Sequence, residues 1–231
     1  TPLYSSAASD VYKRQHLVYA DNRENEFEDR INGLSYKEIA DNGGGILNSA
    51  KKLQAVTEKV LYNKSKTRLE EIMHLGTGAV EIKSGYGLTK EGEIKMLRVI
   101  KKLRDNYPIE IKATFLGAHA VPNKYINDKS GYIKMLIDEM LPSIQKENLA
   151  DFIDVFCETD YFSVSDTDQI LKAGFKQGLV GKIHVNQFTT IGGVQVGVKN
   201  NVLSVDHLEE MRNEDIEALI GTKTMHCFGS N

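Results

Sequence analysis

Several features are scarce in this chain of 231 residues, and each absence narrows the class of protein. It has only two cysteines, Cys157 and Cys227, which lie far apart in the sequence. This number and spacing exclude a disulfide framework and a cysteine-rich zinc module. A reducing cytoplasm is therefore the expected compartment. No run of about 18 apolar residues is present to form a transmembrane helix. The formal net charge of -3 argues against nucleic acid or an anionic membrane surface as the main partner.

Four short apolar runs each end in a polar residue that can carry chemistry. They cover residues 79–86, 109–119, 179–187 and 203–207. A nearly continuous apolar run is typical of a strand that is buried on both faces of a parallel sheet. Parallel strands place their carboxyl ends at one edge, where the active sites of (β/α) barrels lie. The pattern therefore indicates an enzyme.

Helical segments separate the predicted strands. We predict right-handed βαβ units with parallel pairing, and count five clear strands after His16 with one more at each end. An open doubly wound sheet is the alternative, but the Gly-x-Gly-x-x-Gly signature after its first strand is absent, so we prefer a barrel. Glu91 and Glu93 lie near the positive end of the second predicted helix. The helices are expected at about 49–74, 89–104, 132–145 (kinked at Pro142), 165–176, 192–199 and 213–220, and a further strand at 152–157.

The two ends differ from the rest of the chain. Residues 1–15 have no periodicity that would join a core and no apolar stretch of a signal peptide, so we expect a disordered or foreign leader there. The chain stops at residue 231, just as a seventh apolar run begins. We therefore expect residues 16–231 to form one incomplete barrel domain.

Three histidines lie in or at the ends of predicted strands. His184 is either a ligand for zinc or iron or a hydrogen-bonded core residue. His207 is a candidate metal ligand or general acid–base, with Asp206 and Glu209 available to orient it. His119 either contacts a substrate or caps the turn in which it lies.

Weaker signals come from a tyrosine, an arginine and a cysteine. Tyr86 lies in a Gly-Tyr-Gly turn, where the glycines let the backbone approach a ligand, although such a tyrosine can also simply cover a barrel end. Arg23 is either a solvated charge among acidic neighbours or a clamp for a carboxylate. We discount His74 and Lys83, and interpret Cys157 as a small buried apolar group.

Several longer segments together resemble the imidazolonepropionase family of metal-dependent cyclic amidohydrolases. The resemblance covers residues 16–225. It rests on the segments His16-Leu-Val-Tyr-Ala, Arg23-Glu-Asn-Glu-Phe, Arg30-Ile-Asn-Gly, Gly43-Gly-Gly-Ile, Glu81-Ile-Lys-Ser-Gly-Tyr-Gly, Leu116-Gly-Ala-His-Ala-Val-Pro, Phe152-Ile-Asp-Val-Phe-Cys and Ser204-Val-Asp-His-Leu-Glu.

The resemblance implies a fold and a reaction. The fold is α/β, a partial (β/α)8 TIM barrel of the metal-dependent amidohydrolase type, here without its last strands and without the family's small β-sandwich domain. The reaction is hydrolysis of the small molecule 4-imidazolone-5-propanoate to N-formimidoyl-L-glutamate in histidine degradation. One Zn2+ or Fe3+ per intact subunit would lower the pKa of a bound water. The family also suggests a homodimer for the intact enzyme.

The resemblance assigns roles to five residues of the substrate site. Arg23, Tyr86, His119 and Gln187 match substrate-contacting positions, and the cationic Arg23 suits the propanoate carboxylate. Gln187 and His207 are the catalytic candidates. The role implied for His207 is to stabilise or protonate the tetrahedral intermediate.

Two metal ligands carry over from the family. They are His184 and His16, the second histidine of a His-x-His pair, but Arg14 stands where the first should be. The family's eighth-strand aspartate would lie beyond residue 231, and the sequence departs from the family after Met225, so His226 is not assigned as a ligand. Catalytic zinc takes about three protein ligands, and an open barrel leaves strand edges unpaired. We therefore predict that the chain as given is inactive and marginally stable.

Two other functions stay open at this point. One is a different metal-dependent cyclic amidohydrolase or a deaminase, against which Arg23 and residues 81–87 argue. The other is a non-catalytic binding domain without a metal.

Overall fold

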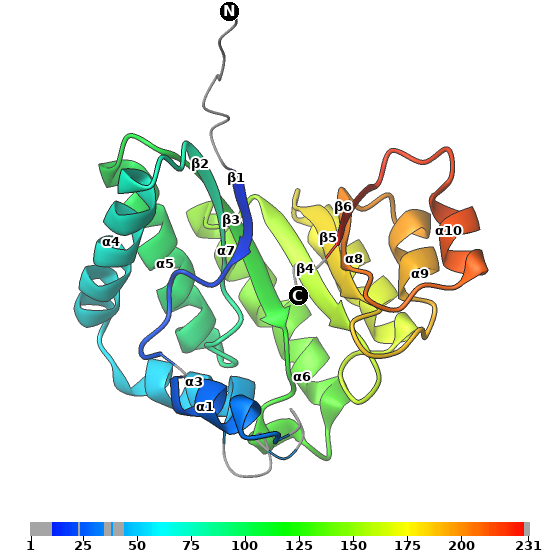
Figure 1. Cartoon of the computed structure of the whole chain (residues 1–231), viewed down its shortest axis with the longest axis horizontal. Helices are drawn as coiled ribbons and strands as arrows, with labels where there is room; N and C mark the ends of the chain where they lie inside the picture. Colours follow the sequence, from blue (N-terminus) through cyan, green and yellow to red (C-terminus); the bar gives the residue numbers. More distant parts are fainter. Residues whose placement is uncertain (1–10, 23, 35–37, 39–43, 229–231) are drawn as a thin grey trace, which may run out of the picture.

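Seven parallel strands form one curled sheet, in the order β1 to β7 along the chain. The computed structural model describes residues 11–22, 24–34, 38 and 44–228. Helices cover the outer face of the sheet, as in half of a barrel (Figure 1). The predicted partial (β/α)8 barrel is confirmed. The strands are β1 Val11–Gln15, β2 Ala79–Lys83, β3 Glu110–Ala118, β4 Phe152–Cys157, β5 Val180–Val185, β6 Ser204–His207 and β7 Met225–Phe228.

The predicted helical segments occur in the predicted order, with differences at residues 49–74 and around Pro142, and the structure adds α1 and a 3-10 turn that were not predicted. They are α1 Glu24–Ile31, α3 Gly45–Ala55, α4 Glu58–His74, α5 Lys90–Asn106, a 3-10 turn Asn123–Tyr125, α6 Lys129–Met135, a π turn Leu136–Met140, α7 Leu141–Glu147, α8 Val164–Lys176, α9 Gly193–Lys199 and α10 Asn213–Leu219.

The single helix predicted over 49–74 is wrong, because the segment forms α3 and α4. The two helices are separated at Val56 and Thr57, where the backbone is extended. The hydroxyl of Thr57 accepts a hydrogen bond from the Val60 N–H at 3.3 Å and so caps α4. Threonine at this position favours a helix start over a continuous helix.

The predicted irregularity around Pro142 is present, one turn earlier than the proline itself. Residues 136–140 form a π turn between α6 and α7. Proline has no N–H to donate to the carbonyl of Asp138, so a regular α-helical ladder cannot continue through this point. The wider turn accommodates the missing hydrogen bond.

Strand β1 lies inside the segment 1–15 that we expected to be a leader. Val11 and Tyr12 pair in parallel with Ala79 and Val80 of β2. The described sheet therefore begins at Val11 and not after residue 15. The first ten residues of the expected leader lie outside the described residues.

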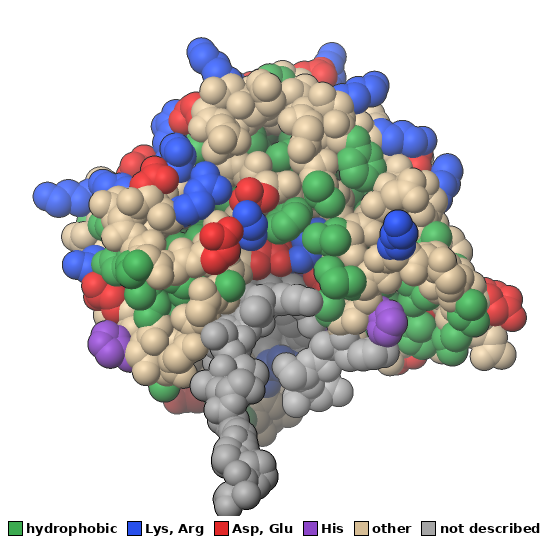
Figure 2. Space-filling model, turned by 90° about the horizontal axis from the view of Figure 1, so that it is seen from above, with side chains coloured by type: hydrophobic (Ala, Val, Ile, Leu, Met, Phe, Trp, Pro, Cys, Tyr) green, Lys and Arg blue, Asp and Glu red, His purple; other side chains and the backbone are tan. Residues whose placement is uncertain are grey.

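The end of the sheet at which the strands begin presents side chains of both charges. Figure 2 looks onto this end from above and shows Lys and Arg side chains around a face that also carries acidic and apolar groups.

Within the described residues, no helix is long and apolar enough to cross a membrane.

Helix α5 packs one apolar side against the sheet, as its sequence spacing predicted. Ile94, Leu97, Ile100 and Leu103 are all buried. Its first turn is capped by Thr89, whose hydroxyl accepts from the Gly92 N–H at 3.0 Å. The helix therefore starts at a fixed point beside the end of β2.

The substitution Leu97→Ala tests this packing. Leu97 is fully buried, so we expect the free energy of unfolding to fall by about 2–5 kcal/mol through lost burial and the cavity left behind. Urea unfolding followed by circular dichroism measures the change. Leu75→Ala is the control, because Leu75 is 78% exposed and its loss should change stability by about 0.5 kcal/mol or less. Equal effects of the two substitutions would contradict the described core.

Candidate active site

Five predicted site residues meet at the carboxyl edge of the sheet. His16 follows β1, Tyr86 follows β2, His119 follows β3, His184 is the second-last residue of β5, and His207 ends β6. The ring of His16 stacks on Tyr86 and on His119, with centroids 4.4 and 5.1 Å apart. His119 lies 6.5 Å from His184, which lies 5.2 Å from His207. The strand ends therefore bring these side chains into one continuous cluster.

Strand β4 adds an aromatic side chain that the sequence did not indicate as part of the site. The ring centroid of Phe156 lies 6.2 Å from those of His119 and His184, in edge contact with each. Tyr161 packs on Phe156 in turn, at 4.4 Å. An apolar surface therefore lies beside both histidines.

Two further predicted residues are Gln187 and Arg23. Gln187 is half-buried in the loop that follows β5, three residues after His184. Arg23, predicted to contact a substrate carboxylate, lies outside the described residues.

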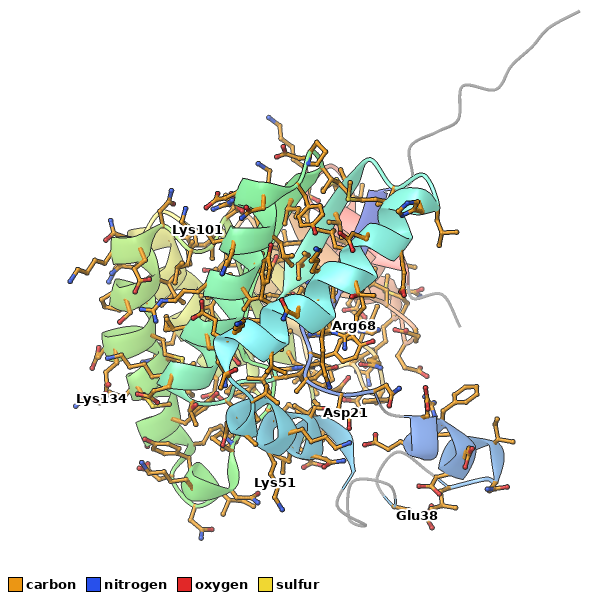
Figure 3. All side chains as sticks on the ribbon, turned by 90° about the vertical axis from the view of Figure 1, so that its left-hand side faces the viewer. Asp21, Glu38, Lys51, Arg68, Lys101 and Lys134 are labelled. Carbon is orange, nitrogen blue, oxygen red and sulfur yellow. The ribbon has the colours of Figure 1, made fainter. Side chains whose placement is uncertain are left out.

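Helix α4 holds the segment that carries His16. Arg68 donates from Nη1 to the carbonyl oxygens of Leu17 and Tyr19, at 3.0 and 2.9 Å. Its guanidinium carbon also lies 3.4 Å from the centroid of the Tyr19 ring. Figure 3 shows Arg68 against this segment, with Asp21 farther along it. These contacts fix the backbone that leaves β1 and thereby the position of His16.

His184 is oriented by a carboxylate on the neighbouring strand. Its Nδ1 lies 3.0 Å from Oδ1 and 2.9 Å from Oδ2 of Asp154, in the middle of β4. An ionised carboxylate can only accept a hydrogen bond, so Nδ1 of His184 carries a proton and donates it to Asp154, and the tautomer with this proton has its lone pair on Nε2. Asp154 therefore fixes both the tautomer and the plane of the ring.

A buried ion network supports this carboxylate. Lys83 is fully buried and donates to Asp154, with Glu81 at 3.3 Å and Asp206 at 3.9 Å from its Nζ. Lys182 pairs with the other side of Glu81. The set contains three carboxylates and two ammonium groups, so its formal charge is negative beside His184.

The pairing sets the protonation of these groups. Burial alone would raise the pKa of Asp154, but His184 and Lys83 lower it below its usual range. Burial opposes the charge on Lys83, and Asp154, Glu81 and Asp206 together raise its pKa above the ordinary value. Each charge is therefore kept by its partners.

Two of the clustered histidines are held neutral. Burial, with His184 as the next cause, lowers the pKa of His119 to about 3. Burial, followed by His119 and His184, also lowers the pKa of His16 well below its ordinary value. The Nδ1 atom of His119 lies 3.0 Å from the carbonyl oxygen of Gly85, which can only accept, so this nitrogen carries the proton.

His207 has a carboxylate beside its ring and an unusual backbone conformation. Its Nδ1 lies 3.0 Å from a carboxylate oxygen of Glu209, confirming that this acid is placed to orient it. His207 and Leu208 have φ values of 86° and 60°, in the left-handed region that side chains rarely adopt. Such backbone strain is concentrated at functional sites.

The described residues supply some donors for a metal ion but not a full set. The Nδ1 atom of His16 is buried without a hydrogen-bond partner, and Nε2 of His184 is left available by Asp154. Across the part of the chain that the structure describes, no three His, Cys, Asp or Glu side chains lie together in a group that could hold a metal ion. The described residues thus do not complete a catalytic metal site.

The sequence interpretation missed the ion network and discounted its central lysine. Asp154 stands in an otherwise apolar strand, and Lys83 and Glu81 stand together in another buried strand, where a charge must be paired. That was the available signal. Cys157, by contrast, is fully buried as predicted, and burial raises the pKa of its thiol to about 11.

The substitution Lys83→Met tests the network. Removing the ammonium group leaves buried carboxylates without compensation, so we expect the free energy of unfolding to fall by about 3–5 kcal/mol. Urea unfolding of the purified chain measures the loss. Lys101→Met is the matched control, because Lys101 is an exposed partner of Asp105 and its loss should cost about 0–1 kcal/mol. A Lys83→Met variant as stable as the control would refute the network.

Comparison with known proteins finds relatives of similar sequence. The chain is 67% identical to an imidazolonepropionase of Flavobacterium johnsoniae and 66% identical to one of Flavobacterium psychrophilum, in each case over 91% of its own length. It spans about half the length of these relatives, 51% of each. The similarity confirms the resemblance that the motifs indicated. No protein-family model matches the chain.

Solved structures agree on the fold. Adenine deaminase from Arthrobacter aurescens has a TM-score of 0.60 at 13% identity, covering 93% of this chain and 69% of that structure. An amidohydrolase from Burkholderia ambifaria, solved with bound Zn, has a TM-score of 0.56 at 13% identity, covering 90% and 63%. At such low identities the likeness concerns the barrel fold alone.

Proposed function

We propose that this chain carries one half of the active site of an imidazolonepropionase, whose whole protein hydrolyses 4-imidazolone-5-propanoate to N-formimidoyl-L-glutamate. The observation that supports this most is the cluster of His16, Tyr86, His119, His184 and His207 at one edge of the sheet. It occurs in a chain 67% identical to a protein of that name.

In this proposal the first three strands contact the substrate. The neutral His119 offers the Nε2 lone pair to an N–H of the substrate ring, because its Nδ1–H is taken by Gly85. The Tyr86 hydroxyl is an additional donor beside it. Arg23 binds the propanoate carboxylate through a charge-assisted pair, and Gln187 contacts the substrate from the loop after β5.

His207 is the proposed proton donor. Hydrolysis of the ring amide requires a proton on the departing nitrogen when the tetrahedral intermediate collapses. The Glu209 carboxylate beside Nδ1 stabilises the imidazolium form of His207, which then donates from Nε2. Gln187, three residues after His184 in the chain, is the second catalytic candidate, as a hydrogen-bonding group.

His16 and His184 are the proposed ligands for Zn2+ or Fe3+. A bound metal would supply a water of lowered pKa. In this chain the two imidazoles fall short of the three protein ligands that catalytic zinc takes, so we keep the expectation that the chain alone is inactive. The proposal also places the intact enzyme in the cytoplasm, as a homodimer.

A chimera tests the function. Residues 16–225 of this chain replace the matching segment of the Flavobacterium johnsoniae relative, and the purified protein is assayed for loss of 4-imidazolone-5-propanoate and for metal content. We expect hydrolysis with one metal per subunit. His184→Ala should abolish both, and His207→Ala should lower kcat by about 100-fold or more with metal retained, since general acid catalysis contributes about 10²–10⁴-fold.

The controls separate this function from its alternatives. His74→Ala should leave turnover unchanged, because His74 is exposed at the end of α4, away from the cluster. The unmodified chain alone should show no turnover above the protein-free rate. A folded chimera that binds metal but deaminates a base and leaves imidazolonepropanoate intact would refute the proposal, and so would a folded chimera without metal or turnover.

A further inference from the structure

One buried carboxylate holds the turn that carries Tyr86. Glu93, in the first turn of α5, is fully buried. Its Oε2 accepts the Gly85 N–H at 3.0 Å, while its Oε1 accepts the N–H groups of Gly87 and Leu88 at 2.7 and 3.0 Å. Burial raises the pKa of this carboxyl, and hydrogen bonds from the Ser84 side chain and the turn partly offset that effect. Three backbone donors thus converge on a single side chain.

The turn needs such an anchor because its backbone is unfavourable. Gly85 has φ 108° and Leu88 has φ 51°, both in the left-handed region, and leucine rarely adopts that conformation. The turn also lies directly on α5, since a Cβ on Gly92 would be 2.7 Å from the Cα of Gly87. The short distance lets the Glu93 side chain reach all three N–H groups.

The same turn determines how two site residues are presented. It carries Tyr86, whose ring stacks on His16 at 4.4 Å and lies 5.6 Å from His119. The carbonyl of Gly85 also receives the Nδ1 proton of His119. A shift of this turn would therefore move the Tyr86 ring. It would also break the hydrogen bond that fixes the tautomer of His119.

We propose that Glu93 is a positioning residue of the site, which acts through the turn of residues 84–88 on Tyr86 and His119. Its hydrogen bonds described above go to the backbone of this turn. The statement that these two side chains contact substrate rests on the function proposed above. Their placement by Glu93 does not depend on that function.

The first test reads the tautomer of His119 in this chain. Side-chain nitrogen NMR should show the proton on Nδ1 in the unmodified protein. Glu93→Gln has one acceptor oxygen in place of two, so at least one of the three N–H groups loses its partner and the His119 signal should become a mixture of tautomers. Glu91→Gln is the matched control, because Glu91 is exposed in the same helical turn and should leave the signal unchanged.

A second measurement covers the case in which Glu93→Gln does not fold. In the unmodified chain, the amide hydrogens of Gly85, Gly87 and Leu88 should exchange at least ~100-fold more slowly than in an unfolded peptide, because each is bonded to a buried carboxylate. Exchange at the unfolded rate would overturn the proposal. Glu93→Asp keeps two acceptor oxygens on a shorter side chain and should give a smaller change of tautomer than Glu93→Gln.

The kinetic test uses the chimera. Glu93→Gln should lower kcat/KM by about 10- to 100-fold, mainly by raising KM, since small displacements of positioning groups have effects of this size. A variant that unfolds more easily yet keeps the single His119 tautomer and the wild-type KM would show a purely structural role and overturn the proposal. An unmodified chimera without turnover would refute the proposed function alone, because the NMR test still decides the role of Glu93.

Discussion

The structure depends above all on the pairing of charges inside the sheet. Lys83 on β2 is fully buried and keeps its charge only because Asp154 on β4 and Glu81 lie against it, while Asp206 on β6 is the next acid. A buried charge without a partner costs several kcal/mol, so these strands cannot change register independently. The network ends at His184, and the electrostatics of the interior therefore fix a candidate metal ligand as well as the fold.

The strands and their order could be predicted, because burial on both faces gives a continuous apolar run that needs no knowledge of distant residues. The break between α3 and α4 could not. Leu53, Val56 and Val60 keep a nearly helical spacing across it, and only the capping role of Thr57 marks the new start. Periodicity reports which side of a helix is buried and is insensitive to one extended residue pair within it.

The site, like the fold, could be predicted only in part. His119, His184 and His207 stand out because polar residues at strand ends converge by geometry alone. The residues that orient these histidines do not stand out, because their partners are far away in the sequence. Lys83 and Asp154, for example, lie 71 residues apart. Glu91 and Glu93 look alike in the sequence, because both are acids at a helix start. Glu91 is exposed, whereas Glu93 is buried and accepts hydrogen bonds from the backbone of a turn. The side of α5 that faces the turn distinguishes them, because it carries Glu93 and the close approach of Gly92 to Gly87.

The contacts that orient the site histidines are all internal to this half-barrel. Asp154 holds His184, Gly85 holds His119, and Glu209 holds His207. None of these contacts requires the part of the relatives that this chain does not span. The orientation of these side chains and the assembly of a metal site are therefore separate matters here: neighbouring strands provide the first, whereas the described residues hold no group of three side chains for the second. The orientation of these three histidines is therefore built by neighbouring strands of the half-barrel itself, through contacts that lie between adjacent or next-adjacent parts of one sheet.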